Sequence, residues 1–492
     1  MWCAMTGEQS RPGGGDTVSP PQKLAGELRP YPEYKESKLP WMGKIPKHWT
    51  EERAKCFFRE VDERSKTGDE ELLSVSHVTG VTPRSQKNIT MFKAESYAGY
   101  KLCKPHDLVI NTMWAWMGAL GVSKYSGIVS SGYGVYRPLD VHELVSEYVD
   151  SLLRTDPYRS EYYCRSTGIR SSRFRLYPEQ FLRIPLVCPP HEEQEKMMAF
   201  LQMKDRQIKR YIHAKRQLIG VLNEQKQAII NHAVTRGIDP NVRLEPSGIE
   251  WLGDVPEHWK IKRLKNLVQN TNEQISTKDP DDLYIALENI ESWTGRLIPT
   301  EGEIIFESQV RRFKPDDILF GKLRPYLAKV TRPAKKGVCV SELLVFRKKT
   351  NEISQSYLEQ KLRSTQIIDL INSSTFGAKM PRADWGFIGN IAIAYPSSDE
   401  EQKKILDLIT KQTAVLVEMI NNARGEIDLI REYRTHLITD VVTGKVDVRN
   451  VEITEHEPVD EEVVKDVEHD DDDDYNNDND NNDDERENDD DK

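Results

Sequence analysis

Residues Glu192–Gly237 read EEQEKMMAFLQMKDRQIKRYIHAKRQLIGVLNEQKQAIINHAVTRG, and this stretch decides the fold of the chain. It contains no proline, and its only internal glycine is Gly220. Apolar residues recur at alternating spacings of three and four, which is the heptad seam of a long helix that packs against another helix. The seam residues are Met198, Leu201, Ile208, Ile212, Ile219, Leu222 and Ile229.

A second stretch, residues 400–444, carries the same seam 208 residues later. Two helices with one register indicate an internal duplication. Because one apolar stripe alone would leave a large apolar face in water, we expect the two helices to pair within the chain. The second seam consists of Leu406, Ile409, Leu416, Ile420, Ile427, Ile430 and Leu437.

A short motif ahead of each globular region repeats at an offset of 210 residues. SKLPWMGKIPKHW at Ser37–Trp49 and SGIEWLGDVPEHW at Ser247–Trp259 share Ser, Trp, Gly, Pro, His and Trp. We interpret each copy as a turn with two packed tryptophans. Neither histidine has nearby cysteines or carboxylates that resemble a metal site.

Composition favours a multidomain protein of a reducing compartment. The 492 residues contain six scattered cysteines without a CxxC pair, no signal-like apolar core and no membrane-length apolar run. Residues 455–492 hold 21 acidic and three basic residues, a net −18, so the rest carries +7 against −11 for the whole chain. A mildly basic body suggests a polyanionic partner.

Short β-branched and aromatic segments at 107–110, 129–136 and 343–346 predict buried strands, so each globular region should be mixed α/β. Helix starts are also marked, since Ser398 and Glu401 form a capping-box pattern. The predicted order is a disordered leader (1–35), a first globular domain (36–188), a long helix (189–238), a second globular domain (239–396), a second long helix (397–446) and an acidic disordered tail (447–492).

The repeated turns, the Pro…Glu-Glu-Gln openings that end at Gln194 and Gln402, and the Val-Thr pairs before Gly237 and Gly444 resemble one known family. They are similar to the specificity subunits of type I restriction–modification systems. The resemblance covers about residues 36–446, and each motif occurs twice, in order, at one period.

The resemblance implies an α/β protein with two target recognition domains separated by two long antiparallel coiled-coil helices, in a pseudo-twofold repeat. Each domain would read half of a split double-stranded DNA target. The helices would set the spacer and dock two methyltransferase subunits, to which restriction (translocase) subunits add. S-adenosylmethionine, ATP and Mg²⁺ would belong to the partner subunits, in the cytoplasm of a prokaryote.

A protein that only reads DNA should lack catalytic motifs. The Gly-Lys pairs are not part of a phosphate-binding loop, and HExxH, GxSxG and the Asn/Asp-Pro-Pro-Tyr segment of amino-methyltransferases do not occur. We therefore expect a non-catalytic, metal-free chain.

DNA contacts should come from basic and small polar residues on loops, because these groups bind phosphates and base edges. The alternative for each loop is a solvated basic surface. The candidates are Gly168, Arg170, Ser171, Ser172, Arg173, Arg175, Asn111, Lys322, Arg324, Gly377, Lys379 and Arg382.

Two other functions remain open at this stage. The chain could be a coiled-coil scaffold that presents two protein-binding domains, or the reader part of a fused restriction enzyme. The acidic tail could be a plain solvated extension or a DNA-mimicking brake. Because base specificity depends on side-chain geometry in loops, no linear code gives the target sequence.

Overall fold

The computed structural model describes residues 28–77, 79–86, 96–168, 174–275, 279, 281–298, 310–377 and 380–453. The acidic tail from residue 454 and most of the predicted leader lie outside these residues. The chain divides into two compact units: residues up to 215 together with those from 425 onward form unit 1, and residues 216–424 form unit 2.

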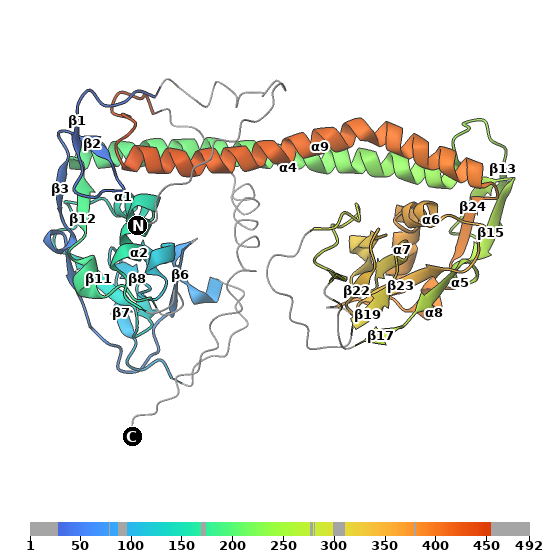
Figure 1. Cartoon of the computed structure of the whole chain (residues 1–492), viewed down its shortest axis with the longest axis horizontal. Helices are drawn as coiled ribbons and strands as arrows, with labels where there is room; N and C mark the ends of the chain where they lie inside the picture. The colour runs from blue at the N-terminus through green and yellow to red at the C-terminus, as the bar shows by residue number, and fades with distance from the viewer. Residues whose placement is uncertain are drawn as a thin grey trace. The chain divides into compact units, whose positions relative to one another are not determined.

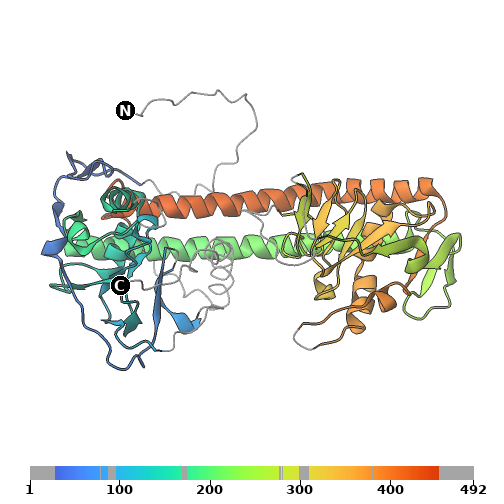
Figure 2. The ribbon, with the colours of Figure 1, turned by 60° about the horizontal axis from the view of Figure 1, so that its bottom comes forward.

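Two long helices dominate the secondary structure, as the seams predict. Helix α4 covers His191–Arg236 and helix α9 covers Asp399–Val442. At ~1.5 Å per residue each is about 65–70 Å long. Both are followed by a glycine with φ of +78°, Gly237 and Gly444, so each stops where a left-handed residue is required. In each unit the parts of α4 and α9 lie side by side (Figures 1 and 2).

The helices pair antiparallel, as the family resemblance implies. In unit 1, Arg434 Nε donates to Asp205 Oδ1 at 2.7 Å, and Lys215 Nζ lies 2.6 Å from Glu426 Oε2. Residue numbers rise along one helix as they fall along the other. Asp205 and Lys215 are charged interruptions of the first seam, and the structure uses both for ion pairs between the helices.

The seams are the faces that the helices bury. In unit 2, Leu222 packs with Leu416 and Ile420, and half-buried Ile219 and Ile229 complete the cluster. Every seam residue is buried or half-buried; the half-buried ones are Leu201, Ile219, Ile229 and Leu406.

Unit 1 is built on a four-stranded antiparallel sheet in the order β4-β11-β8-β9. These strands are β4 (Phe58–Glu60), β8 (Leu108–Ile110), β9 (Leu120–Val122) and β11 (Gly134–Pro138). Two-stranded ribbons surround them: β1 (Tyr34–Glu36) with β2 (Lys44–Pro46), β3 (Thr50–Arg53) with β12 (Pro185–Cys188), β5 (Leu73–Ser76) with β6 (Gly80–Pro83), and β7 (Lys101–Cys103) with β10 (Gly127–Val129). The helices are α1 (Ser146–Leu153), α2 (Asp156–Arg165) and α3 (Pro178–Phe181).

Unit 2 repeats this plan with a sheet in the order β16-β23-β20-β21. Its strands are β16 (Val268–Thr271), β20 (Ile318–Gly321), β21 (Val330–Thr331) and β23 (Leu343–Lys348). A second sheet contains β17 (Gln274–Ile275), β18 (Leu283–Ile285), β19 (Val310–Phe313) and β22 (Gly337–Cys339), and two ribbons pair β13 (Leu244–Pro246) with β14 (Asp254–Pro256) and β15 (Trp259–Arg263) with β24 (Ala392–Pro396). The helices are α5 (Leu264–Leu267), α6 (Gln355–Leu362), α7 (Thr365–Ser373) and α8 (Trp385–Ile388).

Each central sheet separates two apolar cores, because successive strand residues point to opposite faces. In unit 1, Leu108 and Ile110 face the core that holds the helices, whereas Val109 faces a smaller core. In unit 2, Ile318 and Leu319 divide in the same way. The predicted mixed α/β duplication is therefore confirmed in both units.

An ion pair between a buried aspartate and a half-buried arginine occurs at the same place in both units. Arg137 makes a two-pronged contact with Asp107, with Nε and Nη2 each 3.0 Å from a carboxylate oxygen. Arg347 contacts Asp317 in the same way at 2.8–3.2 Å. The hydrogen bonds that Arg137 donates to Asp107 raise the pKa of its guanidinium, so the arginine stays charged.

The repeated turn motif clamps the start of each long helix. In unit 1, Glu193 is buried, and it accepts hydrogen bonds from Trp49 Nε1 at 3.0 Å and from the Tyr31 hydroxyl at 2.5 Å. His48 Nε2 lies 2.8 Å from its second oxygen. In unit 2, Glu401 binds Trp259 Nε1 at 3.0 Å and His258 Nε2 at 2.9 Å. The motif is thus a side-chain clamp, and the capping-box interpretation of Glu401 missed this role.

Glu193 and Glu401 are each followed by a glutamine that ties the start of the helix to the domain by hydrogen bonds. Gln194 Nε2 donates to Pro189 O, and its Oε1 accepts from Val145 N at 2.9 Å. Gln402 repeats both contacts, with Pro396 O at 3.0 Å and with Ser354 N at 2.8 Å.

Several local predictions are wrong. The segment 129–136 is not one strand, because a turn at 130–133 separates β10 from β11. Only the second tryptophan of the first turn is packed: Trp49 is 1% exposed, but Trp41 is 52% exposed. The predicted leader and tail also extend too far into the folded region, since Tyr31 and Val448 are both buried in the core of unit 1.

Candidate nucleic-acid interface

An arginine-bearing hairpin stands at the end of the central sheet in unit 1. Thr167 and Arg175 exchange two backbone hydrogen bonds of 3.0 Å, and Leu176 N donates to Thr112 O at 2.9 Å. Arg175 and Gly168 are exposed. The other predicted contacts of this loop, Arg170, Ser171, Ser172 and Arg173, lie outside the described residues.

Unit 2 carries the equivalent hairpin. Phe376 and Arg382 exchange backbone hydrogen bonds of 3.1 and 3.2 Å, and Ala383 N donates to Lys322 O at 2.8 Å. Gly377 has φ of +95°, which favours glycine at this bend. Lys379 lies outside the described residues.

The structure brings together the cations that were predicted separately in unit 2. The backbone of Leu323 bridges to Arg382, and the Arg324 N–H donates to Pro381 O at 2.8 Å. Arg324 is exposed and has a left-handed φ of +48°, a rare conformation for arginine. We call Lys322, Arg324 and Arg382 the basic patch.

An acidic residue that the sequence analysis missed joins this patch. Arg382 Nε lies 3.2 Å from Glu342 Oε2, and Lys322 Nζ lies 3.9 Å from Glu342 Oε1. A search for basic and small polar residues could not select Glu342. The available signal was its position directly before the strand at 343–346.

Asn111 was predicted to contact DNA, and its burial contradicts this. Its side chain is only 6% exposed, Nδ2 donates to the Tyr133 hydroxyl at 3.2 Å, and Oδ1 accepts from Met113 N at 3.2 Å. Both polar atoms of the buried amide therefore hold the turns beside β8.

Unit 1 has aromatic rings where unit 2 has its charges. Trp114 and Trp116 stack with ring centroids 6.1 Å apart, and Tyr163 contacts both Trp116 at 6.3 Å and Phe174 at 5.4 Å. Trp114 occupies the position equivalent to Arg324 in unit 2. The described ends of the two hairpins therefore pair in the same way, while the side chains beside them differ in chemistry.

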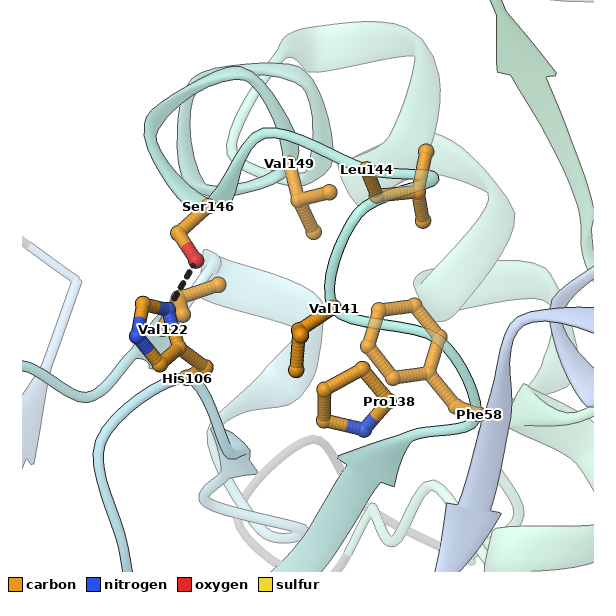
Figure 3. A pocket seen from close by; sticks show the side chains of 8 residues that line it. All are labelled: Phe58, His106, Val122, Pro138, Val141, Leu144, Ser146 and Val149. Carbon is orange, nitrogen blue, oxygen red and sulfur yellow. Dashed lines mark hydrogen bonds between the residues drawn. The ribbon is translucent and has the colours of Figure 1, made fainter. Parts of the chain in front are cut away.

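One small hollow lies elsewhere in unit 1, between the β11–α1 connection and the turn at His106 (Figure 3). Apolar side chains line most of it, and His106 Nδ1 lies 2.8 Å from Ser146 Oγ. Its volume of about 10 Å³ holds roughly one water molecule. We interpret the hollow as a packing defect rather than a ligand site.

Among the residues that the structure describes, no group of three or more His, Cys, Asp or Glu side chains could hold a metal ion. Within the same residues, no helix has both the length and the apolar character needed to cross a membrane.

The fold and hairpins define a class of internally duplicated proteins, in which a paired-helix core joins two α/β domains of different surface chemistry. No family model matches the chain. Over 200 residues it is 24% identical to the specificity subunit of the EcoDI type I restriction enzyme from Escherichia coli. This match covers 38% of the chain and 44% of that relative, so the chain spans less than half of the relative's length. The predicted resemblance to type I specificity subunits is confirmed.

Solved structures of similar proteins align over a longer part of the chain. A chain from a study of complex assembly and conformational transition in the type I R-M system aligns with 81% of this chain and 98% of its own length, at 13% identity and a TM-score of 0.49. The HsdS subunit from Thermoanaerobacter tengcongensis aligns with 82% of this chain and 98% of its own, at 14% identity and a TM-score of 0.38.

Proposed function

We propose that the chain is the DNA sequence-recognition subunit of a type I restriction–modification complex, in which each domain reads one half of a split target. One observation carries the proposal: the described ends of the two hairpins pair in the same way, whereas the side chains beside them differ, with Trp114 in unit 1 at the position of Arg324 in unit 2. A reader of two different half-sites needs this combination of a common scaffold and divergent contact surfaces.

The chemistry of the hairpins supports duplex DNA as the ligand. Arg175 and Arg382 occupy equivalent exposed positions, and an arginine fork matches both phosphate oxygens and the guanine edge. The positive net charge of residues 1–454 favours a polyanion. Both features fit DNA better than a protein partner.

The long helices would dock two methyltransferase subunits and set the spacer between the half-sites. Exposed apolar side chains on the parts of α4 and α9 in unit 2 support a protein partner there, because such side chains are otherwise costly in water. These are Leu218, Val221, Val415 and Met419, which are 38%, 60%, 62% and 44% exposed. Restriction (translocase) subunits would add to that core.

We further propose that this chain contributes recognition but no catalysis. In this assignment the methyltransferase subunits hold S-adenosylmethionine, and the restriction subunits hold ATP and Mg²⁺. The base that we expect to be modified is adenine.

Co-expression with a type I methyltransferase, followed by sequencing of the DNA for modified bases, tests the proposal. The expected result is methylation at one split, asymmetric motif. Methylation without sequence preference would refute the reader role. A scaffold that binds only proteins would leave the DNA unmodified.

A further inference from the structure

Glu342 is the one feature of the basic patch that a simple phosphate-binding surface does not explain. A carboxylate next to a DNA backbone is repelled by the phosphates, so a patch selected only for affinity would avoid it. The side chain of Glu342 keeps 26% of its surface exposed. Its presence in the patch is therefore best explained by a ligand group that donates a hydrogen bond to the carboxylate.

The position of the carboxylate is well defined. Lys322 N donates to Glu342 O at 3.0 Å, which fixes the backbone beside β23. Arg382 Nε holds Oε2 at 3.2 Å, and Lys322 Nζ lies 3.9 Å from Oε1, beyond hydrogen-bond distance. Because a carboxylate has about four acceptor sites, it can accept a further hydrogen bond on its exposed side.

The fold does not need this carboxylate, as unit 1 demonstrates. Thr112 and Gly132 occupy the positions of Lys322 and Glu342 at the same offset of 210 residues. The frame survives there, since Leu176 N still donates to Thr112 O at 2.9 Å. The equivalent hairpin of unit 1 thus forms with a glycine at this position, which argues for a role of Glu342 outside folding.

Base edges in the major groove supply the donor that the carboxylate lacks. Cytosine N4 and adenine N6 present amino groups there, whereas the edges of guanine and thymine present acceptors. A glutamate accepts from cytosine N4 most readily. Arg382 and Lys322 would offset its repulsion by the phosphates on either side.

We propose that Glu342 is a specificity-determining residue of unit 2, which selects an amino-bearing base, cytosine first and adenine second, at one position of its half-site. The proposal rests on the proposed function of the chain as a DNA reader. It predicts that this position never carries guanine or thymine on the contacted strand.

The test uses the full chain co-expressed with a type I methyltransferase, with the methylated motif read by sequencing. Glu342→Gln keeps an acceptor for Arg382 but loses the charge and adds an amide donor. The expected result is a loss of discrimination of roughly tenfold or more at one base pair of one half-site, with the other half-site unchanged. Glu342→Asp keeps the charge and should retain the preferred base at lower efficiency.

Glu352→Gln is the matched control. Glu352 is a partly exposed carboxylate of the same unit, paired with Lys262 Nζ at 2.7 Å, and it lies outside the patch. Its replacement should leave every letter of the motif unchanged.

Three outcomes would overturn the inference. In the first, Glu342→Gln methylates the wild-type motif to the same extent. In the second, it lowers methylation at all sites without changing a letter, which is the result expected if Glu342 only positions Arg382. In the third, it changes letters in both half-sites. Failure of the proposed function itself is distinguishable, because the wild-type chain would then direct no sequence-dependent methylation.

Discussion

Glu193 and Glu401 show how a single residue can hold a domain to a helix. Each glutamate stands in the first turn of a long helix and receives an indole N–H and a histidine nitrogen from the turn motif. In unit 1 the contact is more buried, and the Tyr31 hydroxyl is added. Burial and the hydrogen bond to Glu193 raise the pKa of Tyr31, so the hydroxyl remains a donor.

Glu193→Ala is expected to destabilise unit 1 by about 2–4 kcal/mol, because it leaves the Trp49 and Tyr31 donors buried without an acceptor. Glu193→Gln should cost less, since its amide oxygen still accepts. The measurement is hydrogen exchange of β3 and β12, which separates unit 1 from the rest of a multidomain chain. Glu192→Ala, at the exposed neighbour, is the control. Equal exchange rates in the two alanine variants would contradict the clamp.

Lys361 is a buried lysine that lowers the stability of unit 2 by an amount that depends on pH. Burial lowers its pKa to about 7, and its Nζ donates to Val234 O at 2.8 Å. In unit 1 the position equivalent to Lys361 is Leu152. A tyrosine one turn earlier occurs in both units: Tyr148 donates to Val442 O in unit 1, and Tyr357 donates to Val234 O in unit 2.

Lys361→Leu should stabilise unit 2 below pH 7, by up to about 5 kcal/mol from a pKa lowered from 10.5 to about 7. Between pH 7 and 10.5 the lysine is protonated in the unfolded state but neutral in the folded state. The unfolded state therefore binds more protons, and wild-type stability rises with pH across this range. The variant should lose this rise. Tyr357 continues to donate to Val234 O at 3.3 Å. Thermal midpoints from pH 6 to 10 measure the effect, and parallel curves for the two proteins would rule it out.

At the scale of elements, the helix ends are matched in conformation but not in packing. Gly237 and Gly444 both have φ of +78°. A Cβ on Gly444 would lie 2.4 Å from Pro46 Cδ and 2.8 Å from Trp49 Cη2, whereas a Cβ on Gly237 would lie 3.4 Å from Trp259 Cζ2. The end of α9 is therefore packed against its turn motif more closely than the end of α4.

Gly444→Ala is expected to destabilise the protein more than Gly237→Ala. Both replacements incur the left-handed penalty of about 1–2 kcal/mol, but only the first also displaces the ring of Pro46 and the indole of Trp49. Differential scanning calorimetry of the two variants gives the comparison. Equal losses would mean that the turn yields freely to the added methyl group.

For the whole molecule, the duplication supplies one frame and two sets of contacts. Both units contain the glutamate clamp, the glutamine that follows it, the Asp–Arg pair and the hairpin. The side chains around the hairpins differ. If the paired helices set the spacing of the half-sites, their length should control the spacer without affecting what is read.

Removing two heptads from each helix, residues 208–221 and 417–430, should shorten the unread spacer while preserving both half-sites. The deletions lie opposite each other in the antiparallel register, and ~21 Å of helix corresponds to at most roughly 6 base pairs. The motif methylated by the co-expressed enzyme provides the readout. If the spacer stayed the same length while the half-site letters changed, the helices would not determine the spacing of the half-sites.

The sequence by itself determined the two long helices, their common register and the duplicated turns, because heptad spacing and local motifs are written along the chain. It also selected Lys322, Arg324 and Arg382 as separate candidates for DNA contact. Tertiary structure alone decided that Asn111 is buried, that Glu193 and Glu401 receive the turn residues, and that Glu342 joins the basic patch. Those facts depend on strand pairings between distant segments, such as β20 with β23, which no local pattern encodes.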